Sequence, residues 1–154
     1  TKSQDGSRLV STNDGWENLA ETDIISIHDY AYDGNDFEER YKKDGLDALY
    51  PSQRKLMSYG NKYQGQPVLF TEFGGIAMQN ENCLDGDWGY NTKAKSNDEF
   101  YARYGNLLHA VNKMWFQGFC YTQLTDVQQE INGLLDKNHK PKFDVEKIKK
   151  LTLG

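Results

Sequence analysis

Hydrophobic residues gather in four short runs along the chain, each about five residues long and mostly bounded by turn-forming residues. β-Branched and aromatic side chains are frequent in these runs, which is typical of buried strands. The second and third runs are apolar at nearly every position, and this favours strands covered on both faces, as in parallel sheets. The predicted strands are residues 8–12, 23–28, 67–72 and 118–124.

The segments between these runs are long enough to hold helices. In the clearest one, from Asp98 to Trp115, apolar side chains recur every three to four residues along one face. Ser96, followed by Glu99 three residues later, matches a capping box at its start. We also expect a helix within 52–63, a weaker turn within 37–43, a short helical turn over 16–21, and a last helix capped by Asp144 with Phe143 and Ile148 as its hydrophobic staple.

Strands that alternate with helices predict an α/β fold class of four parallel βα units. With 154 residues and no repeat or linker, the chain is expected to form one domain. A mean hydropathy of -0.84 and the lack of any apolar run near ~18 residues predict a soluble protein with no membrane span. A net charge of -5 makes nucleic acid a poor partner. The lysines near the carboxyl end are interpreted as solvated residues that oppose a helix dipole.

The spacing of cysteine and histidine predicts no disulfide framework and no metal site. We also expect no cofactor. A nucleotide-binding domain would need a glycine-rich loop after the first strand, where the sequence offers only 13–15. The cysteines of the chain are Cys83 and Cys120, and its histidines are His28, His109 and His139.

Polar and aromatic side chains follow each apolar run at its carboxyl end. Parallel strands bring these ends to one rim of the sheet, where α/β folds place their ligands. One such cluster alone is more simply a loop that caps a helix, but four on one rim favour a binding site. The clusters are 13–16, 28–32, 72–75 and 123–126.

Glu72 is the strongest candidate for a catalytic residue among these positions, because it ends a strongly apolar strand and is followed by Gly74 and Gly75. A carboxylate held on a rigid strand end can attack an anomeric carbon and form a covalent glycosyl-enzyme. It can equally be a glutamate that pairs with a donor in a neighbouring loop. The chemistry of the residue alone leaves both interpretations open.

The segment 67–75, Pro-Val-Leu-Phe-Thr-Glu-Phe-Gly-Gly, resembles the nucleophile strand of family 2 glycoside hydrolases, the β-galactosidase and β-glucuronidase group. Segment 7–17 resembles that family's fifth barrel strand, 23–30 its sixth, and 118–134 its eighth strand and following loop. The resemblance covers nearly the whole chain in order. It implies the C-terminal half, strands 5 to 8, of a TIM (β/α)8 barrel, and a retaining exo-glycosidase acting on terminal β-glycosides.

The resemblance also implies roles for individual residues. Glu72 matches the nucleophile, and Tyr30 matches the tyrosine that hydrogen-bonds this carboxylate. His28 stands where the family often has an amide or histidine beside the sugar, although a structural histidine is the alternative. The remaining expected substrate-binding residues are Asn13, Asp14, Trp16, Tyr121, which stands where many members have tryptophan, and Gln123.

The general acid/base of the family, a glutamate in an Asn-Glu pair that ends the fourth strand, has no counterpart here. Asn80-Glu81 lies in a polar loop with no apolar run before it, and Glu130 is interpreted as a loop anchor. We therefore expect the acid/base in the remainder of the parent enzyme, before Thr1, and negligible hydrolysis of natural glycosides by this chain alone.

A half barrel with open edges would also favour self-association. The expected substrate is a β-galactoside; the alternatives are a β-glucuronide, another family 2 substrate, and a non-catalytic carbohydrate-binding module.

Overall fold

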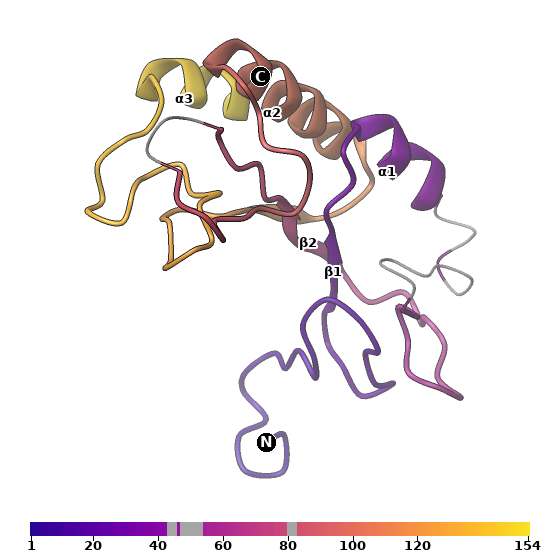
Figure 1. Cartoon of the computed structure of the whole chain (residues 1–154). Coiled ribbons are helices and arrows are strands. Elements are labelled where there is room, and N and C mark those ends of the chain that lie inside the picture. Colours follow the sequence, from indigo (N-terminus) through magenta and orange to yellow (C-terminus); the bar gives the residue numbers. More distant parts are fainter. Residues whose placement is uncertain (43–45, 47–53, 80–82) are drawn as a thin grey trace.

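The computed structural model describes residues 1–42, 46, 54–79 and 83–154 of the chain. Its centre is a parallel sheet in the order β1-β2-β3, formed by Ile25–Asp29, Val68–Gly74 and Gly118–Thr122 (Figure 1). The second, third and fourth apolar runs are therefore strands, as predicted. The three strands alternate with helices, which confirms the α/β class.

The first apolar run, 8–12, does not form a strand, so the prediction of four βα units is wrong for the described residues. Val10 accepts a backbone hydrogen bond from Asp23 (2.8 Å), but its own N–H donates to the Asp23 side chain (2.8 Å). The Thr12 N–H likewise donates to the Thr22 hydroxyl (3.2 Å). Side chains thus take the bonds that a neighbouring strand would supply, and no continuous backbone ladder forms.

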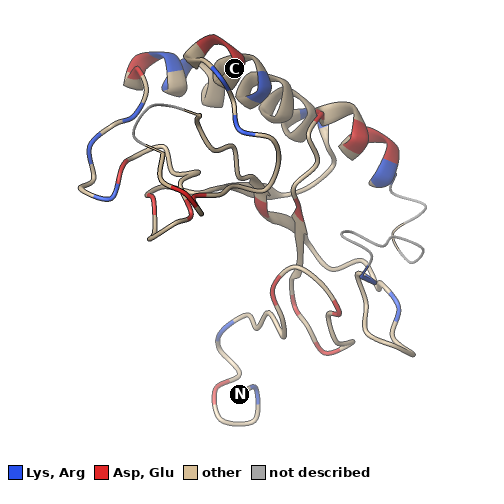
Figure 2. Ribbon diagram, in the orientation of Figure 1, with Lys and Arg blue, Asp and Glu red and all other residues tan. Residues whose placement is uncertain are grey.

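In the part of the chain that the structure describes, three helices cover one face of the sheet: α1 (Gly34–Arg40), α2 (Asn97–Lys113) and α3 (Val145–Leu153) (Figure 1). Helices α2 and α3 begin at the cap residues that were predicted from the sequence. Ser96 accepts a hydrogen bond from the Glu99 N–H (3.2 Å), and Asp144 accepts one from the Lys147 N–H (2.8 Å). Each helix carries an acidic side chain in its first turn and a basic one in its last (Figure 2), which complements the helix dipole.

Two predicted helical segments differ in the structure. Residues 16–21 are not helical, because Asn18 pairs with Met57 in a parallel bridge. That bridge also uses the backbone of 55–58, so the described part of the predicted helix 52–63 holds no helix; residues 52 and 53 lie outside the described residues. Instead of the weak turn expected within 37–43, a helix forms that begins nearer the N-terminus, at Gly34, and ends at Arg40 (α1).

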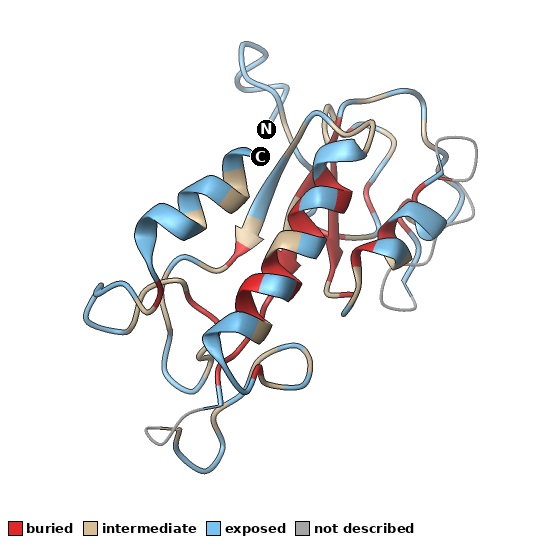
Figure 3. Cartoon of the chain, turned by 90° about the horizontal axis from the view of Figure 1, so that it is seen from above, coloured by how far each residue is buried: buried red, intermediate tan, exposed pale blue. Residues whose placement is uncertain are grey.

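The core lies between the sheet and the helices, where β1, β2 and the inner face of α2 are buried (Figure 3). Phe70 and Phe73 of β2 both belong to it, with ring centres 5.3 Å apart. Residues three apart would face opposite sides of a regular strand, but the register shifts between them. This irregularity keeps Phe73 in the core.

β3 is the least covered strand, with an exposed Phe119 and Cys120 (Figure 3). Among the described helices, none combines the length and apolar character that a membrane span requires.

Candidate active site

Glu72 lies near the carboxyl end of β2, paired in register with His28 of β1. Its side chain is 36% exposed, so the carboxylate reaches solvent from a rigid element. The Tyr30 hydroxyl donates a hydrogen bond to Glu72 Oε2, and His28 Nδ1 lies 3.5 Å from the same oxygen. Among the described residues, Oε1 has no hydrogen-bond partner. One carboxylate oxygen is thus held while the other is left for a further contact.

Burial is the largest influence on the Tyr30 hydroxyl, and together with the hydrogen bond to Glu72 it raises the pKa of Tyr30 far above its usual value. Tyr30 therefore keeps its proton at any physiological pH. It acts toward Glu72 only as a hydrogen-bond donor, which is the form that stabilises an ionised carboxylate.

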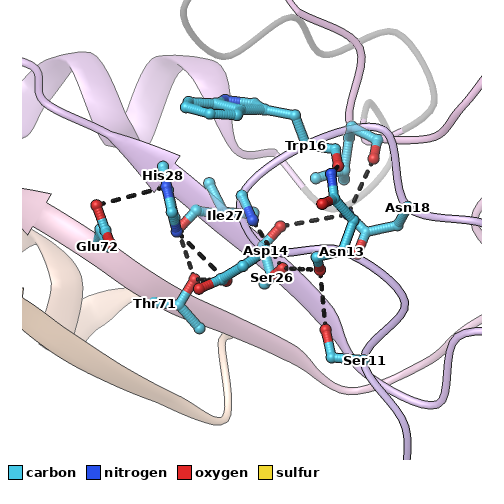
Figure 4. A network of polar contacts seen from close by, with 12 residues as sticks. Ser11, Asn13, Asp14, Trp16, Asn18, Ser26, Ile27, His28, Thr71 and Glu72 are labelled. Atoms are coloured by element: carbon cyan, nitrogen blue, oxygen red, sulfur yellow. Dashed lines mark hydrogen bonds and ion pairs between the residues drawn. The ribbon is translucent and has the colours of Figure 1, made fainter.

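His28 stands between two carboxylates (Figure 4). Its Nε2 lies 3.3 Å from Asp14 Oδ1, opposite the nitrogen that faces Glu72. The ring is 11% exposed and packs edge to face against Trp16, with centres 5.1 Å apart. Gly15 lies against its face with a φ of +92°, and a Cβ there would be 2.7 Å from His28 Cγ. The position therefore requires glycine both for its backbone and for its space.

Asp14 is held by Thr71, whose hydroxyl donates a hydrogen bond of 2.7 Å to Oδ1 (Figure 4). Partial burial works to raise the pKa of Asp14, but the hydrogen bond from Thr71 and the neighbouring His28 outweigh it, so this pKa is lowered from its ordinary value. Asp14 is consequently an ionised group at neutral pH.

The turn that carries Asp14 is attached to β1 by Ser26. The Ser26 hydroxyl donates to the Asn13 carbonyl (2.8 Å) and accepts from the Gly15 N–H (2.8 Å). The Asn13 amide closes the turn by donating to the Trp16 carbonyl (2.5 Å). Buried Ser26 thus explains how a segment that forms no strand still delivers its side chains to the rim.

The structure brings six of the eight predicted site residues together at the carboxyl ends of β1 and β2. Tyr121 lies elsewhere, on the side of the sheet that the helices cover. Its ring packs edge to face on Phe73 (5.6 Å) and on Tyr104 of α2 (4.9 Å), and its hydroxyl accepts the Ile76 N–H (3.4 Å). The six gathered residues are Asn13, Asp14, Trp16, His28, Tyr30 and Glu72.

Gln123 is held within the loop that follows β3. Its side-chain amide donates to the Glu130 backbone carbonyl (3.4 Å), and its backbone carbonyl accepts a hydrogen bond from the Leu134 N–H (3.0 Å). The Glu130 carboxylate accepts from the Asn132 amide (3.1 Å), an arrangement that fits the predicted loop anchor. Asn80-Glu81 lies outside the described residues.

Two aromatic residues beside Tyr30 were not predicted from the sequence. Tyr90 stacks on Tyr30 with ring centres 3.4 Å apart and an angle of 6° between the planes. Trp88 packs edge to face on Tyr90 (5.4 Å). Both follow β2 in a loop whose only unusual sequence signal is aromatic residues next to Gly89.

The carboxylates of Asp14 and Glu72 and one nitrogen of His28 offer donor atoms within 4.8 Å of one another. This oxygen and nitrogen set could hold a divalent cation.

No protein-family model matches this sequence, and no curated protein matches it. Among solved structures, the fold is similar to that of Bifidobacterium dentium β-glucuronidase complexed with coumarin-3-O-glucuronide, with a TM-score of 0.52 and 17% sequence identity. The match covers 86% of this chain and 21% of that chain, so this chain spans about a fifth of the length of the enzyme. At this identity the likeness shows a similar fold and no more.

Proposed function

We propose that this chain supplies the nucleophile side of a retaining β-glycosidase site, with Glu72 as the nucleophile. The main support for the proposal is that the two oxygens of the Glu72 carboxylate have different contacts. Tyr30 and His28 both engage Oε2, whereas Oε1 has no hydrogen-bond partner among the described residues. The fold likeness to a β-glucuronidase agrees with this assignment.

In the proposed reaction, Glu72 Oε1 attacks the anomeric carbon of a terminal β-glycoside. The bond from that carbon to the leaving oxygen breaks, and the aglycone departs with the electron pair and receives a proton from a general acid. Water then attacks the glycosyl ester, losing its proton to the same group acting as a base, and Glu72 is released. Tyr30 orients Oε2 throughout and loses no proton.

Asp14 is near enough to Glu72 to be considered as the general acid, but its electrostatics oppose that role. A general acid needs a pKa raised toward the working pH, whereas that of Asp14 is lowered. We therefore assign the acid/base to a glutamate outside these 154 residues, carried by the remainder of a longer enzyme.

β-Galactosides are the proposed substrates, and β-glucuronides are the second candidate. The solved structure that this fold resembles is a β-glucuronidase. A cation also stands at this rim, since the Arg54 guanidinium lies 5.4 Å from the centre of the Trp16 ring. Such a group could meet the carboxylate of a glucuronide.

Activated substrates test the proposal without the missing acid. 2,4-Dinitrophenolate leaves without protonation, so the unchanged chain is expected to release it from the dinitrophenyl β-galactoside or β-glucuronide, and Glu72→Gln is expected not to. The preferred sugar identifies the substrate class. Binding of both sugars with no release by either protein would instead indicate a non-catalytic carbohydrate-binding module.

A further inference from the structure

The carboxylates of Asp14 and Glu72 approach the same histidine, and this brings three metal-binding side chains into one cluster (Figure 4). One ligand atom from each of Asp14, His28 and Glu72 lies within 4.8 Å of the other two. Asp14 belongs to the turn before β1, His28 to β1 and Glu72 to β2. Because the cluster is assembled from three separate segments, no spacing in the sequence indicates it.

His28 contributes a nitrogen that the protein leaves without a hydrogen bond. Its Nε2 is buried, and no described residue forms a hydrogen bond with it. The residue as a whole is 9% exposed, and Trp16 and Gly15 pack against its ring. Buried polar atoms nearly always have a partner. An unpaired nitrogen held in place beside the Asp14 carboxylate therefore points to a bound ligand.

The distances in the cluster suit a shared metal ion. His28 Nε2 lies 3.3 Å from Asp14 Oδ1. Two ligands of one tetrahedral zinc ion, each about 2.0–2.2 Å from it, lie roughly 3.3–3.5 Å apart. Glu72 is the third ligand, since one of its oxygens is within 4.8 Å of both other atoms. Its Oε1 is also without a hydrogen-bond partner in the part of the chain that the structure describes.

The chemistry of the three ligands selects the type of ion. Two carboxylates beside a neutral imidazole offset the charge of a divalent cation. Imidazole nitrogen suits zinc and similar transition metals, whereas magnesium and calcium prefer oxygen ligands alone. The Thr71 hydroxyl donates to Asp14 Oδ1 (2.7 Å), and such outer hydrogen bonds commonly orient a ligating carboxylate. The set therefore fits zinc, with a fourth position left for water.

We propose that Asp14, His28 and Glu72 bind a zinc ion that reversibly blocks the candidate nucleophile. An oxygen of Glu72 that ligates the ion is not available to attack an anomeric carbon. The positive ion beside it also opposes the oxocarbenium-like charge of the glycosylation transition state. The binding of zinc follows from the cluster itself, whereas its inhibitory effect rests on the proposed function.

Zinc binding to the 154-residue chain, measured by competition with a chromophoric zinc chelator, tests the site without any activity. We expect one zinc ion per chain, and a large excess of Mg²⁺ should not displace it. Loss of an outer hydrogen bond to a ligand typically weakens binding by about 10- to 100-fold, so Asp14→Asn, His28→Gln and Glu72→Gln should each weaken it by at least that much. His109→Gln removes an exposed histidine of α2 and should leave the affinity unchanged.

Asp14→Asn is the decisive variant, because the Asp14 side chain is 61% exposed and its replacement leaves the core intact. The same zinc affinity in Asp14→Asn and the unchanged chain would overturn the site. Displacement of zinc by Mg²⁺ would overturn it as well, because the histidine would then contribute nothing to the choice of ion.

The inhibitory effect is tested by labelling Glu72 with a 2-deoxy-2-fluoro-β-glycosyl fluoride, which needs no general acid. We expect saturating zinc to abolish the adduct, a chelator to restore it, and Asp14→Asn to be labelled at the same zinc concentration. Labelling that continues while zinc is bound would contradict the block. If no adduct formed even without zinc, the proposed function would fail, whereas the zinc titrations would still decide whether the site exists.

Discussion

Tyr30 donates its hydroxyl to the Glu72 carboxylate across the β1–β2 pair, although the two residues are 42 positions apart in the sequence. Tyr90 covers the Tyr30 ring, and the Asn91 amide donates to the Tyr30 carbonyl (2.5 Å). The donor is thus fixed from both its ring and its backbone. This relationship gives Glu72 a defined orientation before any substrate binds, which is the condition for efficient attack at a fixed carbon.

Replacing the donor tests that orientation. Tyr30→Phe removes a hydrogen bond to a charged group, worth about 1.5–3 kcal/mol, and keeps the ring that stacks on Tyr90. We expect glycosylation of Glu72 by a fluoroglycosyl fluoride to slow by about 10- to 100-fold. Tyr32→Phe is the matched control, since Tyr32 contacts Arg103 through its ring. Equal rates for Tyr30→Phe and the unchanged chain would show that this hydrogen bond does not assist Glu72.

Gly74 is expected to be far less replaceable than Gly65, although both have a φ of +91°. A Cβ at Gly74 would overlap the Tyr121 ring, whereas a Cβ at Gly65 would have no atom within 4 Å. Gly65→Ala should therefore lower the free energy of unfolding by the backbone strain alone, about 1–2 kcal/mol. Gly74→Ala should add about 1–3 kcal/mol from overpacking. Urea unfolding measures both, and equal losses would mean that Tyr121 moves aside freely.

The lowered pKa of Asp14 predicts a defined pH dependence. Because its folded pKa lies below the unfolded value of 3.8, its contribution to stability is present above that pH and is lost as the pH falls through the folded pKa. Thr71→Val removes the hydrogen bond from the Thr71 hydroxyl and should raise the pKa of Asp14 in a carboxyl ¹³C NMR titration.

Asp136 serves as the internal reference in the same spectra. Its pKa is lowered mainly by backbone N–H groups of its own turn, so it should not respond to Thr71→Val. The same pKa for Asp14 in both proteins would indicate that Thr71 does not stabilise the carboxylate.

The chain alone should hydrolyse ordinary alkyl glycosides negligibly. Without a general acid, a poor leaving group such as methoxide loses an assistance of about 10²–10⁴ in rate. Methyl and dinitrophenyl β-glycosides compared on the same preparation should therefore differ far more than on an enzyme that has its acid. Ready turnover of the methyl glycoside, abolished in Glu72→Gln, would place the acid within these 154 residues.

Local patterns predicted the elements whose structure depends on local sequence. The continuous apolar runs became β1, β2 and β3, and the Ser96 and Asp144 caps begin α2 and α3. The run at 8–12 failed because a strand requires a partner, and here the side chains of Thr22 and Asp23 satisfy the backbone instead.

The site residues at the ends of neighbouring strands were predicted from the sequence, whereas those in the loop that folds back beside Tyr30 were not. Glu72 and His28 share one rim because adjacent parallel strands carry them, and Tyr30 directly follows the strand that carries His28. Tyr121 did not join them because its ring packs against Tyr104 of α2. The position of Tyr90 depends on long-range contacts with Gly75 and Tyr30, and no spacing in the sequence reveals such contacts.

The most direct test of the central claim is peptide mapping by mass spectrometry after incubation with 2-deoxy-2-fluoro-β-galactosyl fluoride and, in parallel, the glucuronyl analogue. The account predicts one covalent glycosyl group per chain with one of the two reagents, attached through an ester to Glu72, and no adduct in Glu72→Gln. An adduct on a different carboxylate, or an unmodified chain with both reagents, would contradict the assignment of Glu72 as the nucleophile.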